Sequence, residues 1–213
     1  MPVNRFTSML AFGAAVAVAV ALSPVAAARG GQASASNMEK LDITAFAISM
    51  GTAATGANAV VDITIRRWST AAERQSLITA MMEKGPDDLL KVLQKLPSHG
   101  KFRIPGLIGP DPTNLRLGND LHYAWQTPLP EGGRRIVIAT DRYITFEEAR
   151  AQPRTIDYPF TLFEIRVNKA GEGEGKMSVA TKIEFNKKED QIVLENWSSE
   201  PVRLNKVKVT VAK

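Results

Sequence analysis

The chain contains no cysteine among its 213 residues, so neither a disulfide nor a thiol nucleophile can form within it. Histidine is almost as scarce, with only His99 and His122. A zinc site built on three histidines is therefore excluded, as is the cysteine that anchors bacterial lipoproteins. The motifs of serine hydrolases, zinc proteases and nucleotide-binding loops are also missing. These absences exclude common classes of exported enzyme, but they do not indicate a function.

Charge of one sign is nowhere concentrated. The chain has 27 Lys and Arg residues and 22 Asp and Glu residues, which gives a net charge of +5. The two signs are interspersed along most of the sequence, whereas a nucleic-acid surface needs a continuous basic stripe. We therefore expect no nucleic-acid partner.

A long hydrophobic run stands near the N-terminus, from Met9 to Leu22. Arg5 precedes this run, and a Ser-Pro break and three alanines follow it. This order is typical of a cleavable secretory signal peptide, and the run is shorter than the roughly 20 residues that span a bilayer. We expect residues 1–28 to be removed and residues 29–40 to form a flexible leader. The mature protein is then a soluble bacterial protein, periplasmic or secreted, with no stable membrane insertion.

Apolar and polar side chains alternate in most segments after residue 40, which is the pattern of half-buried strands. The phase changes between Ile43 and Phe46, which predicts a β-bulge or a strand covered on both faces. We expect strands at 41–50, 61–66, 115–126, 134–143, 163–168, 176–185, 191–197 and 206–211. The short connections between the later strands favour an antiparallel meander. The predicted fold is mainly β, an antiparallel barrel or two-layer sheet of about eight strands, in a single domain at 41–213.

Two helices are predicted between the second and third strands, as a helical hairpin at residues 70–96. Thr70 and Glu73 have the spacing of a capping box at the start of the first helix. Gly85 ends this helix, and Pro86 is suited to the first turn of the next.

Three further segments are expected to lie outside the strands. Residues 97–114 contain many prolines and glycines, which predicts an irregular loop or lid. Residues 145–150 are predicted to form a short helix. Residues 171–176 read Gly-Glu-Gly-Glu-Gly-Lys, but Met177 replaces the hydroxyl residue of a phosphate loop and the two glutamates would repel phosphate. We interpret this segment as a flexible hairpin loop.

Polar residues near the end of one predicted strand are the best candidates for acid or base chemistry. Asp141 and Arg142 lie at this end, Glu147 follows, and His122 lies on a neighbouring strand. Catalysis would need these side chains to converge within hydrogen-bond reach; otherwise Asp141 pairs with a neighbour at a strand-to-helix turn. A metal site could combine the histidines with Asp120, but we predict no metal, no cofactor and no assigned catalytic residue.

Aromatic and methionine side chains could line an apolar cavity in the barrel. The candidate ligand-binding residues are Trp68, Met81, Met82, Tyr123, Trp125 and Tyr143. In outline such a barrel is similar to the lipocalin and calycin barrels. The Gly-x-Trp motif of the lipocalins is absent, so no residue roles are carried over.

Three functions remain open from the sequence. The first is an exported barrel that binds a small hydrophobic molecule in its pocket. The second is a proton-transfer or hydrolytic enzyme that uses Asp141 and Glu147. The third is a protein-interaction module of the cell envelope with an unknown partner.

Overall fold

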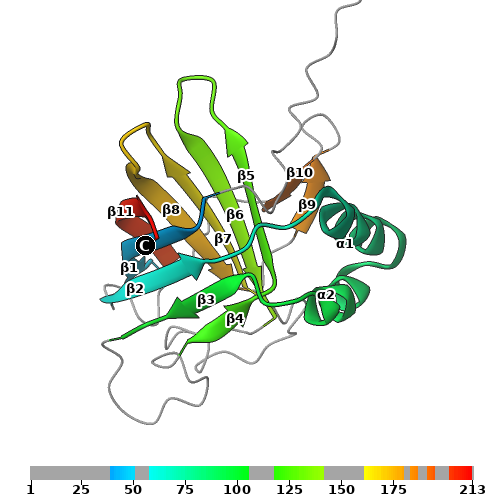
Figure 1. Cartoon of the computed structure of the whole chain (residues 1–213). Helices are drawn as coiled ribbons and strands as arrows, with labels where there is room; N and C mark the ends of the chain where they lie inside the picture. Colours follow the sequence, from blue (N-terminus) through cyan, green and yellow to red (C-terminus); the bar gives the residue numbers. More distant parts are fainter. Residues whose placement is uncertain are drawn as a thin grey trace, which may run out of the picture. The chain divides into compact units, whose positions relative to one another are not determined.

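The computed structural model describes residues 39–50, 58–105, 118–141, 161–179, 183–186, 191–194 and 202–212. Most of the described chain lies in strands, with one pair of helices between the second and third strands (Figure 1). The elements are β1 (Leu41–Ser49), β2 (Asn58–Ile65), α1 (Ala71–Lys84), α2 (Pro86–Lys95), β3 (Gly100–Arg103), β4 (Asn119–Leu121), β5 (Tyr123–Pro128), β6 (Arg134–Thr140), β7 (Thr161–Val167), β8 (Glu172–Val179), β9 (Ile183–Asn186), β10 (Gln191–Leu194) and β11 (Val202–Val211). The predicted signal peptide and the predicted helix at 145–150 lie outside the described residues.

Nine of the strands form one antiparallel sheet in the order β4-β3-β2-β1-β11-β8-β7-β6-β5. The two outermost strands, β4 and β5, are consecutive in the chain, and only His122 separates them. At this bend the His122 backbone N–H donates to the Ala139 carbonyl at 2.9 Å. The Thr140 hydroxyl donates to the Asp120 carbonyl at 2.8 Å. The sheet is therefore a nearly closed barrel, which confirms the predicted mainly β fold class.

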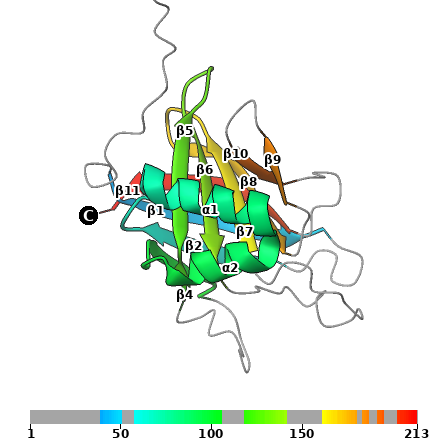
Figure 2. The same ribbon diagram turned by 90° about the vertical axis from the view of Figure 1, so that its right-hand side faces the viewer.

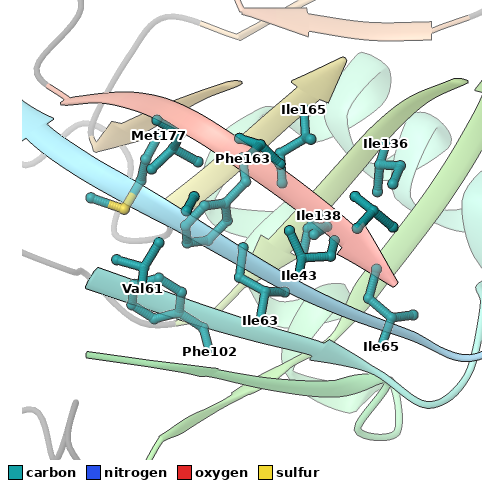
Figure 3. Packing of buried hydrophobic residues seen from close by; sticks show 14 of the residues in the cluster. Ile43, Val61, Ile63, Ile65, Phe102, Ile136, Ile138, Phe163, Ile165 and Met177 are labelled. Atoms are coloured by element: carbon teal, nitrogen blue, oxygen red, sulfur yellow. The ribbon is translucent and has the colours of Figure 1, made fainter. Parts of the chain in front are cut away.

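Alternating side chains of the sheet fill the interior of the barrel. Figure 3 shows residues of β1, β2 and β3 meeting residues of β6, β7 and β8 across the interior. The rings of Phe102 and Phe163 lie 4.9 Å apart between centroids, and both side chains are fully buried. Trp68, just after β2, is buried in the same cluster. The inward-facing apolar side chains of the alternating strands thus form the core.

The helical hairpin forms as predicted. The Glu73 backbone N–H donates to the Thr70 hydroxyl at 3.1 Å, and the Thr70 backbone N–H donates to Glu73 Oε2 at 2.7 Å, which completes the capping box. Gly85 joins α1 to α2 with a φ of 84°, a conformation that favours glycine. In the described part of the chain, neither helix is long and apolar enough to cross a membrane.

The helix pair packs on the outer wall of the barrel. Figure 2 shows α1 and α2 in front of β5 and β6. A second buried cluster forms there from Leu77, Leu89 and Leu93 of the helices and Tyr123, Ala139 and Leu162 of the sheet. The hairpin is thus held by apolar contacts with the side of the sheet.

The bulge predicted in the first strand does not lie in β1. Between the pairs Thr44–Lys208 and Phe46–Asn205 there is one residue of β1 but two of β11, and Lys206 in this interval has a φ of 49°. Leu41, Ile43, Ala45 and Ala47 of β1 are buried in unbroken alternation. Against β2 the pairing of β1 continues without a shift. The extra residue therefore belongs to β11, whose pairing with β8 shifts at the same place.

The prediction of an irregular segment over 97–114 is wrong for part of its length, because Gly100–Arg103 forms β3 between β2 and β4. Gly100 and Phe102 are buried, whereas Lys101 and Arg103 are exposed. Pro97 and Pro105 flank this strand without interrupting it, so the proline signals mark its two ends. The remainder of the predicted loop from residue 106 lies outside the described residues.

The prediction of a flexible loop at 171–176 is also wrong, because β8 begins at Glu172. Gly173 and Gly175 occupy alternate positions of the strand, and Glu172 and Glu174, which precede each of them, are exposed. A Cβ atom on Gly173 would lie 1.9 Å from the Arg166 carbonyl oxygen. The glycines therefore allow β8 to approach β7 closely, and the glutamates take the outer positions.

The later strands do not form one continuous meander. β8 ends at Val179, and β9 pairs with β10 in a separate two-stranded sheet, so the single strand predicted at 176–185 is wrong. β11 then pairs with both β8 and β1. Apolar and polar residues alternate in both β8 and β9, so the sequence pattern does not indicate that the two strands pair with different partners.

Candidate functional site

The structure brings together two of the predicted catalytic residues. His122 lies at the bend between β4 and β5, and its Nε2 is 3.5 Å from Oδ1 of Asp141, just after β6. Its Nδ1 lies 2.9 Å from the Leu96 carbonyl at the end of α2. Because a carbonyl only accepts, Nδ1 carries a hydrogen. Both ring nitrogens thus face protein oxygens. Arg142 and Glu147 lie outside the described residues.

A second polar cluster surrounds His99 and was not expected from the sequence. His99 and Ser69 are buried, and the Ser69 Oγ lies 3.1 Å from His99 Nε2. Glu73 Oε2 is 3.7 Å from the same nitrogen, while Nδ1 donates to the Pro97 carbonyl at 2.8 Å. A catalytic triad would place the carboxylate on the ring nitrogen opposite the serine. This buried cluster instead joins the start of α1 to the end of α2.

The ionisation of this cluster follows from its burial and partners. Burial lowers the pKa of His99, and the positive charges of Arg67 and His122 act in the same direction, against the Pro97 carbonyl and Glu73. Burial alone would raise the pKa of Glu73, but hydrogen bonds from Thr70 and Arg67 and the Arg67 charge bring it below its ordinary value. The cluster therefore favours a neutral histidine beside an ionised Arg67–Glu73 pair.

The predicted ligand-binding residues lie in separate parts of the fold. Trp68 is in the barrel core, where its indole N–H donates to the Glu39 carbonyl at 2.8 Å. Tyr123, Trp125 and Met81 belong to the cluster beneath the helices. Met82 is 53% exposed. Tyr143 lies outside the described residues.

An apolar pocket does lie beneath the helix pair, with a volume of about 30 Å³. Its lining comprises Leu77, Leu89, Leu93, Tyr123, Val137, Ala139 and Leu162. The volume is close to that of one water molecule in the liquid, whereas sites for small molecules measure roughly 300–1,000 Å³. We interpret this pocket as a small packing gap.

A larger hollow lies on the outer face of β7, β8 and β11. Its volume is about 510 Å³, and it is lined by Glu164, Arg166, Glu174, Gly175, Lys176 and Arg203. We call these six residues the charged groove. Sheet register explains why charged side chains gather there, because Glu164 pairs with Lys176, and Lys176 pairs with Arg203. Three residues distant in sequence thus form one row across three strands.

Glu164 is only 3% exposed although it lies on the outer face of the sheet. Arg135 holds it with Nε 2.8 Å from Oε1 and Nη2 3.0 Å from Oε2. Arg166 Nε lies 3.0 Å from the same Oε1. Two guanidinium groups therefore compensate one buried carboxylate. With Lys176 and Arg203 beside it and Glu174 opposite Arg166, the groove carries more positive than negative charge.

Burial lowers the pKa of Lys176 below its ordinary value. The charges of Arg203 and Arg166 lower it further, and those of Glu164 and Glu174 oppose the change. An ammonium group in such a place gains stability when an anion approaches. The groove therefore suits a negatively charged ligand.

Sequence reasoning missed this site because its members lie on three strands whose pairing was not predicted. The sequence feature that could have indicated it was the outward position of the charged residues in each alternating strand.

Among the described residues, no cluster of three or more His, Asp or Glu side chains could hold a metal ion.

No family model matches the chain, and neither the curated proteins nor the solved structures contain a significant match.

Proposed function

We propose that the protein is an exported binding module, periplasmic or secreted, that holds an anionic ligand in the charged groove without transforming it. The observation that carries the proposal is the row formed by Glu164, Lys176 and Arg203. Glu164 is compensated by two arginines, and Lys176 and Arg203 add two further positive charges beside it. The volume of about 510 Å³ falls within the range of ligand sites.

Electrostatics supports an anion with more than one charge. Two unit charges 4 Å apart interact by about 4 kcal/mol at an effective dielectric constant near 20, and salt weakens this interaction for exposed groups. Arg166 and Arg203 are exposed, so each contributes less than this figure. Several carboxylates on one ligand would add such modest contributions together.

The other functions considered from the sequence have less support. A small hydrophobic molecule would need far more space than the gap of about 30 Å³ beneath the helices. An enzyme built on His122 and Asp141 would need a ring nitrogen directed at a substrate, yet both nitrogens of His122 face protein oxygens. A binding role at the outer face is consistent with the expected protein-interaction module.

The decisive experiment measures binding of a hexaglutamate peptide by isothermal titration calorimetry. We expect wild type to bind the peptide, with an affinity that falls as salt rises. Arg203→Glu reverses one charge of the row and should weaken binding about tenfold, which corresponds to about 1.4 kcal/mol. Lys208→Glu is the matched control, because Lys208 is exposed on the same strand and is outside the groove lining.

Thermal melting establishes that both variants remain folded before affinities are compared. Equal weakening by the two substitutions would show a general charge effect and would refute the groove as the site. Absence of any binding of hexaglutamate or inorganic phosphate to wild type at low salt would refute the proposal itself.

A further inference from the structure

An exposed apolar surface continues from the charged groove onto β1 and β2. Phe46 and Ile48 occupy outward positions of β1, Met50 follows two residues later, and Val60 lies on β2. Met50 is 49% exposed and Val60 is 47% exposed. We call these four residues the apolar patch. Isolated exposed apolar residues are ordinary, but a cluster on one sheet face is typical of a contact surface.

The register of the sheet joins the apolar patch to the charged groove. Ile48 of β1 pairs with Arg203 of β11, and Arg203 pairs with Lys176 of β8. Phe46 pairs with Val60 beside this row. Apolar and cationic side chains are therefore direct cross-strand neighbours on one outer face.

The length of this surface sets the size of an occupant. From β7 to β2 the sheet order contains four spacings between neighbouring strands, which together measure about 19 Å at about 4.8 Å each. An extended polypeptide rises about 3.3 Å per residue, so roughly six residues would cross the surface. Such a segment would run across the strands and contact them through its side chains.

We propose that the ligand of the charged groove is an extended segment of a partner protein, with carboxylates at one end and apolar side chains at the other. This inference rests on the proposed function, because the carboxylates would bind beside Lys176 and Arg203. The apolar end would cover Ile48 and Val60. Charge complementarity and the continuity of the row identify the occupant.

The openness of the patch distinguishes this occupant from an anionic lipid. Val60 and Met50 are half exposed on a sheet face, so an acyl chain lying on them would keep one side in water. Small-molecule sites normally bury most of the ligand surface. A protein segment can leave its outer side in solvent or against the rest of the partner.

The test compares two hexapeptides by calorimetry, each supplied in both chain directions. One contains three glutamates and three leucines, and the other contains three glutamates and three serines. Wild type should bind the leucine peptide about tenfold more tightly than the serine peptide. Val60→Ser should reduce affinity for the leucine peptide about threefold and leave the serine peptide unchanged. Val211→Ser, at a position 59% exposed on β11, should change neither.

The outcomes separate this inference from the function on which it rests. Equal binding of both peptides to wild type would overturn the protein segment and leave the anion site intact. Binding of neither peptide would overturn the inference, and absence of hexaglutamate and phosphate binding as well would overturn both. Dodecanoate that binds more tightly than the leucine peptide, and is weakened by Val60→Ser, would assign the surface to a lipid and overturn the inference.

Discussion

Two histidines perform related tasks at the end of α2. The imidazole of His122 donates to the Leu96 carbonyl, and that of His99 donates to the Pro97 carbonyl. Carbonyls at the end of a helix lack partners within the helix, so these side chains provide them. His122, one of the residues considered for acid or base chemistry, therefore has a structural role that it shares with His99.

The buried position of His99 makes stability depend on pH. Its pKa is lowered in the folded state, so the unfolded state binds more protons between that pKa and about pH 6.5. The free energy of unfolding should therefore fall as the pH is lowered from about 7.5 to 5. The total loss is up to about 1.4 kcal/mol for each unit by which folding lowers the pKa of His99. Urea unfolding at several pH values measures this slope, and His99→Gln should flatten it.

Two other groups in contact with this cluster bear on the measurement. Glu73 also has a lowered pKa, so its contribution is lost in a separate window below about pH 4.5. Arg67 Nη2 lies 2.6 Å from Glu73 Oε1, so it acts on the carboxylate directly. If His99→Gln is too unstable to study, NMR titration of the wild-type imidazole gives the same answer. Stability that is constant or rises on acidification through pH 6 would contradict the prediction.

At the scale of elements, β8 shows how glycine can belong to a strand. Gly173→Ala would place a Cβ atom 1.9 Å from the Arg166 carbonyl oxygen of β7. We expect a loss of roughly 2–3 kcal/mol in unfolding free energy, because backbone must move to relieve the overlap. Denaturant unfolding measures this loss.

Gly85→Ala is the control for this substitution. Gly85 has φ 84° and ψ −167°, a region that essentially only glycine adopts, but no atom lies within 4 Å of the added Cβ, so its cost should be purely conformational, on the order of 1–3 kcal/mol. A Gly173→Ala variant as stable as wild type would mean that β8 does not approach β7 closely.

Local patterns in the sequence were sufficient for several elements. Thr70 and Glu73 predicted the capping box, and Gly85 and Pro86 predicted the boundary between the two helices, because each depends on residues close together in the chain. The charged groove was not predictable in this way. It requires β11 to lie beside β8, and alternation specifies which side chains share a face without specifying the neighbouring strand.

At the scale of the whole molecule, the N-terminal segment carries the prediction of export. Protein purified from its own host should begin near Arg29, because the hydrophobic run and the alanines after it suit removal by a signal peptidase. Mass spectrometry of the intact protein and of its N-terminal peptide measures the start. A mature chain that still contains Met9 to Leu22 would contradict the prediction.

The place of β11 in the sheet has a consequence for the order of folding. β11 is the last of the described strands, yet it joins β1 to β8 through pairs such as Leu41 with Val211 and Val202 with Met177. Until Val202–Val211 has been synthesised, the strands before it can form only two separate pieces of sheet, β4-β3-β2-β1 and β8-β7-β6-β5. Contacts this distant in sequence also form slowly. A nascent chain would therefore remain incompletely folded until Val202–Val211 has been synthesised, and an incompletely folded polypeptide can be threaded through a narrow channel.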